Sequence, residues 1–304
     1  MSDSQTQTIV LTAASGSNAI TEDVVAQVQS ALAGIGPGID AWLGQGHGWE
    51  VQVTASAAEI ATHLAMLRAA LARHPIDVNA VPADGMRRKR LLIADMDSTI
   101  IEQECIDELA DVLGLREQVS GITERAMRGE LAFEPALRER VALLAGLETT
   151  AIDRLLAEQI TLTPGARTLV QTMRTHGAFT ALVSGGFTLF TGPVAARAGF
   201  HIHTSNTLDT ADGTLSGTVR APILGREAKR DALNGFVREQ RLAISDTLAV
   251  GDGANDLAMI EAAGLGVAFR AKPAVADAAD AAITHGDLTA LLYLQGYRDD
   301  AFVD

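Results

Sequence analysis

The sequence predicts an α/β protein with a doubly wound, Rossmann-like parallel sheet, a helical cap inserted into it, and a small ferredoxin-like α+β domain in front. Three observations predict this fold. From Leu91 onward, short apolar strands alternate with amphipathic helices. Soon after the first of these strands, residues from about 103 to 160 show almost purely helical periodicity. The first eighty residues follow another order: strand, helix, two strands, helix, strand.

The composition is that of a large globular chain. Its 304 residues, 47% of them hydrophobic, are enough to bury a sizeable core. A net charge of -14 argues against nucleic-acid and membrane-surface partners, which need a basic footprint. The one cysteine, Cys105, cannot form an intramolecular disulfide. No secretory signal and no long apolar run is visible, so we expect a cytoplasmic enzyme.

Residues 1–81 are predicted to form the ferredoxin-like, ACT-like domain. Helical spacing of apolar residues occurs in "TEDVVAQVQSALAGIG" and again in "AEIATHLAMLRAALARH". Between them, "DAWLGQGHGWEVQVTA" places a glycine-rich turn between two strands. The segment "PADGMRRKR", 82–90, follows as a linker. Its basic residues could suggest nucleic-acid binding, but in so acidic a chain we interpret them as solvated.

Residues 91–304 supply the parallel sheet and its insertions. The strands are "LLIA", "AFTALVS", "TLAVGD" and "LGVAF". In "TPGARTLVQTMRTHG", Thr163 is the predicted N-cap of a helix, Pro164 its first residue and Gly177 its stop. The helical stretch 103–160 is interpreted as the cap. A second insertion, "NTLDTADGTLSGTV", has an Asp-Gly turn between alternating segments and predicts a β-hairpin.

Polar residues follow three of the predicted strands at the point where each strand ends. In an open parallel sheet the carboxyl ends of the strands meet at one edge, where ligands bind, so these side chains should converge. They are Asp95 and Asp97 after "LLIA", Ser184, Gly185 and Gly186 after "AFTALV", and Asp252, Asn255 and Asp256 after "TLAVG". Lys229 opens the helix before the last of these strands. Together they supply what phosphoryl transfer through an aspartyl-phosphate requires.

The spacing of Asp95 and Asp97 suits that chemistry. In an extended segment, residues i and i+2 point to the same side, roughly 6.6 Å apart, so two carboxylates can flank one phosphoryl group. The phosphate dianion would repel them, so the site needs Mg²⁺, and Asp252 can complete its ligands. Gly185 lets the backbone approach an oxyanion, and Lys229 adds a positive charge.

Other motif interpretations fit less well. An EF-hand beginning at Asp95 would need glycine and glutamate where Ile100 and Ile106 stand. No G-x-x-x-x-G-K-[ST] phosphate loop is present. The pair His201 and His203 has same-face strand spacing but no third ligand nearby, so a surface strand is favoured. Cys105 is expected to be a packed thiol rather than a nucleophile.

The sequence resembles a known family at these motifs. "DMDSTI", "VSGGF", the lysine of "EAKRD" and "GDGANDLAM" are similar, in this order, to the four motifs of the haloacid dehalogenase-like superfamily. "ECIDELA" and "ITERAMRGELAFEPALRERVALLAGL" resemble the cap of its phosphoserine phosphatases. The resemblance covers residues from about 88 to 298, and it is loose in the N-terminal unit.

The resemblance implies roles for the core residues. Asp95 would be the nucleophile and a magnesium ligand. Asp97 would be the general acid and base, and its backbone carbonyl would also bind the metal, whose site Asp252 would complete.

Ser184, Gly185 and Lys229 would hold the phosphoryl group. Asn255, taken as a further substrate-binding residue, and Asp256 would support the metal and the lysine.

The resemblance assigns selectivity to the cap. Glu104 would receive a substrate ammonium group and Arg140 a carboxylate, while Met127 and Phe133 would close the pocket. An ammonium and a carboxylate are what an amino-acid phosphate offers beyond its reacting group, and Glu with Arg is the complementary pair.

The implied function is Mg²⁺-dependent hydrolysis of O-phosphoserine to serine and phosphate, the last step of serine biosynthesis. One alternative is transfer of the phosphoryl group to another acceptor such as homoserine. An alternative of another class is a regulatory amino-acid-binding protein, against which the intact catalytic set argues. The expected partner is the small-molecule substrate, with no nucleic acid and no membrane, and a homodimer is left open.

Overall fold

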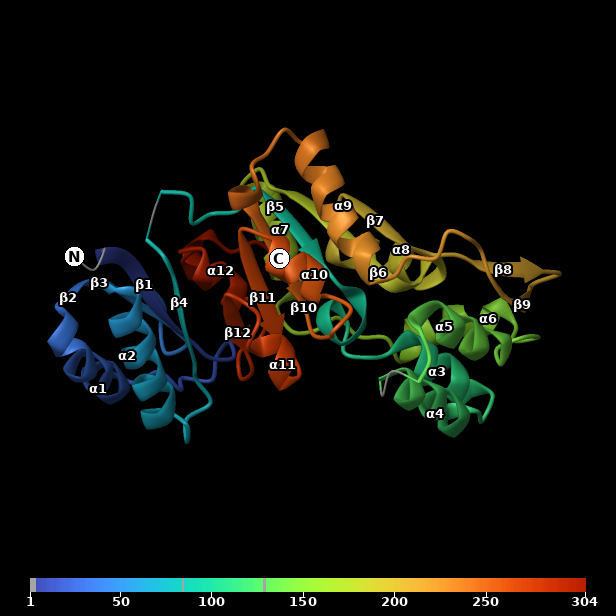
Figure 1. Ribbon diagram of the computed structural model, residues 1–304, viewed down its shortest axis with the longest axis horizontal. Coiled ribbons are helices and arrows are strands. Elements are labelled where there is room, and N and C mark those ends of the chain that lie inside the picture. Colours follow the sequence, from blue (N-terminus) through green and yellow to red (C-terminus); the bar gives the residue numbers. More distant parts are fainter. Residues whose placement is uncertain (1–3, 84, 128–129) are drawn as a thin grey trace.

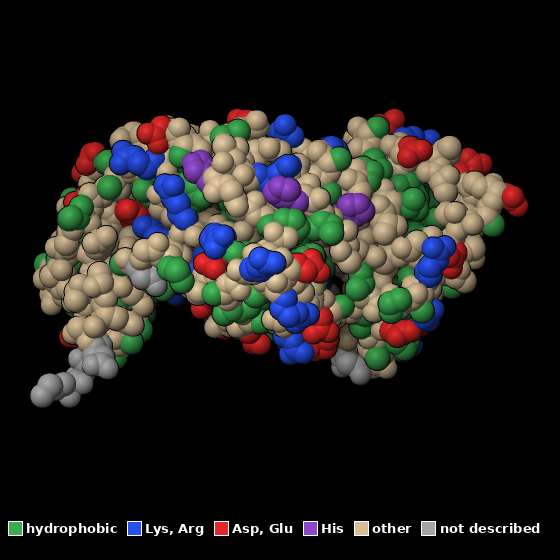
Figure 2. Space-filling view, turned by 90° about the horizontal axis from the view of Figure 1, so that it is seen from above, with side chains coloured by type: hydrophobic (Ala, Val, Ile, Leu, Met, Phe, Trp, Pro, Cys, Tyr) green, Lys and Arg blue, Asp and Glu red, His purple; other side chains and the backbone are tan. Residues whose placement is uncertain are grey.

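The structure is a computed structural model that describes residues 4–83, 85–127 and 130–304. It forms three parts in a row: an N-terminal sheet, a central parallel sheet and a helical cap (Figure 1). Figure 2 shows the row from above, with acidic and basic side chains interspersed on that face. Within the described ranges, no helix is both long and apolar enough to cross a membrane.

The N-terminal part has the predicted ferredoxin-like order. Its elements are β1 (Ser4–Thr12), α1 (Glu22–Leu32), β2 (Pro37–Gly44), β3 (Gly48–Ser56), α2 (Ala57–Ala70) and β4 (Asp77–Pro82). The strands form an antiparallel sheet in the order β2-β3-β1-β4. Ile9 and Leu11 of β1 pack with both helices, and the side chains of Ser56 and Glu59 form a capping box that starts α2.

The central sheet has six parallel strands in the order β12-β11-β10-β5-β6-β7. The strands are β5 (Leu91–Ala94), β6 (Phe179–Phe187), β7 (Ile202–Asn206), β10 (Thr247–Gly251), β11 (Leu265–Phe269) and β12 (Ala281–Ile283). β5 is buried on both faces, because Leu91 and Ile93 enter one hydrophobic cluster while Leu92 and Ala94 enter another.

Helices cover both faces of this sheet, which confirms the doubly wound prediction. One face packs on α9 (Arg226–Glu239), α10 (Leu257–Ala262) and α11 (Pro273–Ala276). The other packs on α7 (Ala166–Thr175), α8 (Thr188–Ala198) and α12 (Ala290–Leu294).

The predicted start of α7 is wrong by two residues. Thr163 and Pro164 belong to a turn that the Ala166 N–H closes on the Thr163 carbonyl at 2.9 Å. Gly165 has φ +79°, a left-handed conformation that stops the helix from extending backwards. The predicted stop holds, since α7 ends at Thr175 and Gly177 also has positive φ.

The cap consists of the predicted helices together with the hairpin. The helices are α3 (Cys105–Val112), α4 (Arg116–Met127), α5 (Phe133–Ala142) and α6 (Thr149–Glu158), and the hairpin is β8 (Leu208–Ala211) with β9 (Thr214–Val219). The backbone N–H of Leu215 donates to Leu147, and that of Gly146 donates to Leu215, both at 2.8 Å. These bonds join two insertions that are distant in the sequence into one body, seen at the right of Figure 1.

The N-terminal sheet docks on the core through buried polar groups. The carboxylate of Asp77 in β4 accepts the backbone N–H groups of three successive residues, Thr284, His285 and Gly286, at 2.8–3.2 Å. The side chain of Asn79 both donates to and accepts from the backbone of Ala282 in the edge strand β12. Asn79 thereby gives β12 the hydrogen bonds that a neighbouring strand would give.

The basic segment that follows β4 is solvated only in part: Arg88 and Arg90 are exposed as predicted, whereas Arg87 and Lys89 are half-buried. Arg87 forms an ion pair with Glu50 at 2.6 Å and donates to the carbonyls of Tyr293 and Leu294 in α12. Lys89 donates to the carbonyl of Ser245. Arg88 lies over the ring of Tyr297, 4.2 Å from its centroid. Arg87 therefore links the N-terminal sheet to the core, while Arg88 and Lys89 fasten the segment to the core.

We expect Asp77→Ala to lower the free energy of unfolding by about 2–4 kcal/mol, because three backbone N–H groups, the one of Gly286 buried, lose their acceptor. Urea unfolding followed by circular dichroism measures the loss. Asp40→Ala is the matched control, since the exposed Asp40 carboxylate accepts one bond, from Trp49 Nε1 at 3.2 Å. Equal losses in the two variants would show that Asp77 does not stabilise the docked state.

Candidate active site

The order of the strands brings the three predicted strand ends together. Ala94, the last residue of β5, lies opposite Val250 of β10 on one side and Leu182 of β6 on the other. Asp95 follows Ala94 directly. Asp252 and Ser184 each follow their strand partner by two residues, so they flank Asp95 at the carboxyl edge of the sheet.

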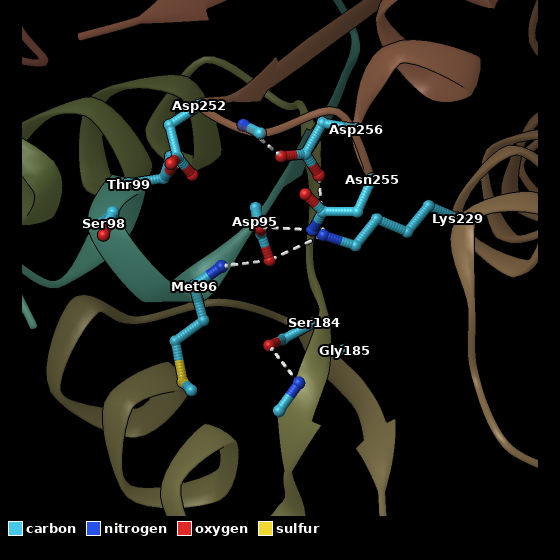
Figure 3. A network of polar contacts seen from close by, with 12 residues as sticks. Asp95, Met96, Ser98, Thr99, Ser184, Gly185, Lys229, Asp252, Asn255 and Asp256 are labelled. Carbon is cyan, nitrogen blue, oxygen red and sulfur yellow. Dashed lines mark hydrogen bonds and ion pairs between the residues drawn. The ribbon is translucent and has the colours of Figure 1, made fainter. Parts of the chain in front are cut away.

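A buried ion pair forms the centre of the site. Lys229 Nζ lies 2.7 Å from Asp95 Oδ1 and 2.6 Å from Asp256 Oδ1, and all three residues are buried (Figure 3). Burial alone would lower the pKa of Lys229, but the Asp256 and Asp95 carboxylates outweigh it and raise that pKa. Lys229 is therefore a fixed cation that comes from the first turn of α9.

Asp95, Asp252 and Asp256 place carboxylate oxygens within 4.8 Å of one another. Burial and the charges of Asp95 and Asp256 raise the pKa of Asp252 to about 8. The raised pKa means that the protein's own cations do not balance the charges of these buried carboxylates. Hard carboxylate oxygens converging on one point fit a divalent metal site. Thr99 Oγ1 donates to Asp252 Oδ1 at 3.2 Å and orients that carboxylate.

Asp97 lies apart from that carboxylate group. Its Oδ1 accepts the backbone N–H of Cys105 at 2.9 Å, and a Cβ added to Gly186 would meet its Oδ2 at 2.9 Å. Burial, Glu104 and Asp95 raise the pKa of Asp97 to about 7. A carboxyl group with such a pKa can both hold and release a proton near neutral pH.

Residues 184–186, which we call the oxyanion loop, were predicted to contact an oxyanion. In Figure 3, Ser184 and Gly185 of this loop lie opposite Asp95. The Gly186 N–H donates to Ser184 Oγ at 2.8 Å, and α8 begins two residues later, at Thr188. Asn255 Nδ2 lies 3.4 Å from Asp95 Oδ2. The Asn255 amide and the Lys229 cation thus contact the Asp95 carboxylate, and the Ser184 hydroxyl lies on the opposite side of the site (Figure 3).

The cap brings Glu104 and Arg140 toward this edge. Glu104 Oε1 accepts a hydrogen bond from Ser98 Oγ at 2.6 Å. Ser98 directly follows Asp97 in the chain. Arg140 donates to Thr123 Oγ1 at 3.3 Å. Burial lowers the pKa of Arg140, while the charges of Asp107 and Glu104 oppose that shift.

The two apolar cap residues predicted to close the pocket are Phe133 and Met127. A Cβ added to Gly225 or Gly185 would lie 3.4 or 3.6 Å from the Phe133 ring, so this ring lies over the core loops. Met127 is the last residue of α4, and its side chain falls outside the described part of the structure.

Sequence reasoning missed several residues of the site. Ser98 has φ +52°, which turns its hydroxyl toward Glu104, and no local pattern predicts that conformation. Thr99 is fully buried and polar next to the aspartates, a signal that could have been used. Thr123 contacts Arg140 only because α4 packs on α5.

The competing motif residues have structural partners. Cys105 is buried, and burial together with Asp97 and Glu104 raises the pKa of its thiol, as expected for a packed thiol. The imidazole of His203 contacts Thr191 Oγ1 at 3.0 Å. His201 contacts Thr180 at 3.1 Å. Neither histidine belongs to the carboxylate group.

This arrangement defines a class of phosphoryl-transferring enzyme, and comparison with known proteins names its family. A family model described as haloacid dehalogenase-like hydrolase matches residues 92–261. The chain belongs to this family.

Within this family, the relatives that the chain resembles include phosphoserine phosphatases. The chain is 46% identical over 235 residues to the phosphoserine phosphatase SerB2 of Mycobacterium tuberculosis, covering 77% of this chain but only 57% of that protein. It is 41% identical over 229 residues to the phosphoserine phosphatase of Haemophilus influenzae, covering 74% and 73%. The crystal structure of a probable phosphoserine phosphatase from Vibrio cholerae superposes with a TM-score of 0.76 at 31% identity, over 97% of this chain and 88% of that one.

We expect Mg²⁺ to stabilise the metal-free protein more strongly at pH 8 than at pH 6. The pKa of Asp252 is raised to about 8, so in the folded protein this carboxyl keeps a proton that an unfolded chain has released. Without metal, its contribution to stability therefore falls as pH rises from about 4 to 8. The cation must displace that proton, so its apparent affinity should be roughly tenfold or more weaker at pH 6.

Thermal shift titrations with MgCl₂ at the two pH values measure this difference. Asp252→Asn is the control, because its amide does not titrate and is a poorer ligand. Equal shifts at both pH values in the unaltered protein would rule out competition between metal and proton at Asp252.

Proposed function

We propose that this chain is a Mg²⁺-dependent phosphoserine phosphatase that works through an aspartyl-phosphate on Asp95. The observation that carries the proposal is the buried Asp95–Lys229 pair at 2.7 Å, beneath a cap that carries Glu104 and Arg140. The names of the curated relatives support it. We also propose that the protein acts in the cytoplasm; a homodimer stays a prediction.

Asp95 attacks the phosphorus of the substrate, and the bond from phosphorus to the serine oxygen breaks. Asp97 gives its proton to that oxygen, so serine leaves as a neutral alcohol. A water molecule then attacks the same phosphorus, and Asp97 takes a proton from it. The bond between phosphorus and the Asp95 oxygen breaks, which releases phosphate and restores the Asp95 carboxylate and the protonated Asp97. A pKa of about 7 lets Asp97 perform both transfers.

Fixed positive charge and hydrogen-bond donors stabilise the phosphoryl group during both steps. Lys229 holds its charge next to Asp95, and Ser184 and the backbone of Gly185 supply donors on the opposite side. Asp95, Asp252 and the backbone carbonyl of Asp97 would hold the Mg²⁺. When bound, the cation supplies positive charge that balances the carboxylates and the phosphoryl oxygens.

Selectivity is proposed to come from the cap. Glu104 would pair with the ammonium group of phosphoserine and Arg140 with its carboxylate. The ring of Phe133 lies over Gly185 and Gly225 and would exclude water from the reacting group. A part for Met127 in closing the pocket stays a prediction. The groups around Asp95 contact only phosphate and metal, so they serve any phosphomonoester.

Phosphate release from a panel of phosphomonoesters tests the proposal. We expect O-phosphoserine to be the best substrate, ahead of phosphothreonine, sugar phosphates and p-nitrophenyl phosphate. Repeating the assay with homoserine present would reveal transfer to another acceptor. A preference for a substrate without an ammonium group would refute the proposed function.

We expect Asp95→Asn to abolish turnover while the protein remains folded, because an amide cannot form the acyl-phosphate. Phosphate release and circular dichroism measure the two properties. Asp40→Asn is the control, since Asp40 is an exposed aspartate of the N-terminal sheet. Near-normal turnover in folded Asp95→Asn would remove the nucleophile assignment.

We expect Glu104→Gln to lower kcat/KM for phosphoserine by about 10² or more, because the substrate ammonium would lose its charged partner. Hydrolysis of p-nitrophenyl phosphate should change little, since that ester carries no ammonium group. The ratio of the two values for kcat/KM is the deciding quantity. An equal fall for both substrates would make Glu104 a structural or catalytic residue instead.

A further inference from the structure

The pairing of β6 with β7 is interrupted at the oxyanion loop. β6 and β7 pair in regular parallel register up to Val183 opposite Thr204, and pairing resumes at Phe187 opposite Asn206. Between these pairs, β6 has three residues, Ser184–Gly186, while β7 has only Ser205. The backbone of the loop therefore lacks strand partners there, and another group must fix its orientation.

The side chain of Asn206, at the carboxyl end of β7, provides that group. Asn206 is 1% exposed. Its Nδ2 donates to the Gly185 carbonyl at 2.8 Å and lies 3.4 Å from the Leu224 carbonyl. Its Oδ1 accepts the Leu224 N–H at 2.7 Å. One planar amide thus joins the oxyanion loop to the segment that leads into α9.

The bond to Gly185 determines where the next N–H points. The Gly185 carbonyl and the Gly186 N–H belong to one planar trans peptide group, so they point in opposite directions. With the carbonyl held by Asn206, the N–H is directed to the other side, where it meets Ser184 Oγ at 2.8 Å. That bond fixes the side chain of Ser184, which lies opposite Asp95 in Figure 3.

The bonds from Asn206 to Leu224 hold the start of α9, the helix that carries Lys229. Leu224 directly precedes Gly225, the N-cap of α9, and Lys229 lies in the first turn of that helix. The Ser184 hydroxyl, which the Gly186 N–H holds, and the cation of Lys229 are therefore both positioned by the same buried amide. A shift of either segment would separate the two groups that must contact one phosphoryl group.

We propose that Asn206 is a positioning residue for the oxyanion pocket: it orients the Gly185–Gly186 peptide group and holds it in register with Lys229. The inference rests on the proposed phosphatase function and deepens it, since it assigns phosphate affinity to a residue that touches neither substrate nor metal. Asp95 and Ser184 are proposed to contact the phosphoryl group directly, whereas Asn206 acts through two backbone segments.

Two variants of Asn206 separate its roles. Asn206→Ala removes every bond of the amide. Asn206→Asp keeps the shape and the acceptor for the Leu224 N–H, but it places a second oxygen against the Gly185 carbonyl and so favours rotation of the peptide group. The matched control is Asn79→Ala. Asn79 is equally buried and bonds the backbone of Ala282 through both amide atoms. Ala282 lies in the edge strand β12, which β11 and β10 separate from β5 and Asp95.

Binding of inorganic phosphate to the full-length protein with Mg²⁺ is the deciding measurement, by calorimetry and by inhibition of p-nitrophenyl phosphate hydrolysis. We expect both Asn206 variants to bind phosphate about tenfold or more weakly, since a lost hydrogen bond to an ordered donor is worth roughly one decade. Inhibition by L-serine, which has no phosphoryl group, should be unchanged. Asn79→Ala should lose comparable thermal stability while keeping its affinity for phosphate.

Phosphate affinity in folded Asn206→Asp equal to that of the unaltered protein would overturn the proposal, even if Asn206→Ala fails to fold. So would an equal loss of phosphate affinity in Asn79→Ala, because the effect would then follow general destabilisation. A different result would count against the proposed function alone: an unaltered protein that binds phosphate but does not hydrolyse phosphoserine.

Discussion

The buried contact of Lys229 with Asp95 and Asp256 is the interaction on which the site depends. Taking carboxylates out of water is costly unless a cation accompanies them, and here a single lysine lies within 2.7 Å of two of them. It does not balance Asp97 and Asp252, whose pKa values are raised to about 7 and about 8. The fold therefore holds an excess of carboxylate groups whose charge a divalent cation can balance.

The strand order explains why a sequence could reveal this site at all. β5 pairs with β10 and β6, so three strand ends meet, and polar residues after apolar runs identify them without any alignment. The same rule applied to β7 would have found Asn206, the last residue of that strand. It was missed because "IHTSN" is partly exposed and polar, and so does not read as a buried strand.

Features that depend on long-range contacts could not be predicted. The ferredoxin-like order, the cap and the hairpin follow from local periodicity and turn residues. The prediction of a solvated linker was wrong for Arg87, because this residue finds its partners Glu50 and Leu294 only once two sheets are docked. The start of α7 was misplaced for a related reason: Thr163 and Pro164 form a good local helix start, but Gly165 lies against Asp287 and Thr289 of a distant loop.

That distant loop connects three parts of the molecule. The backbone N–H groups of residues 284–286 donate to the Asp77 carboxylate of the N-terminal sheet. The Asp287 carboxylate accepts the Ser15 N–H at 2.9 Å. The Leu288 N–H donates to the Pro164 carbonyl, and the Thr163 N–H donates to Ile100, where the chain leaves for the cap. Docking of the N-terminal sheet and the return of the chain from the cap thus use consecutive residues of one loop. A change at the docking surface must therefore be accommodated next to the cap connection, a few residues beyond Asp95 and Asp97 in the chain.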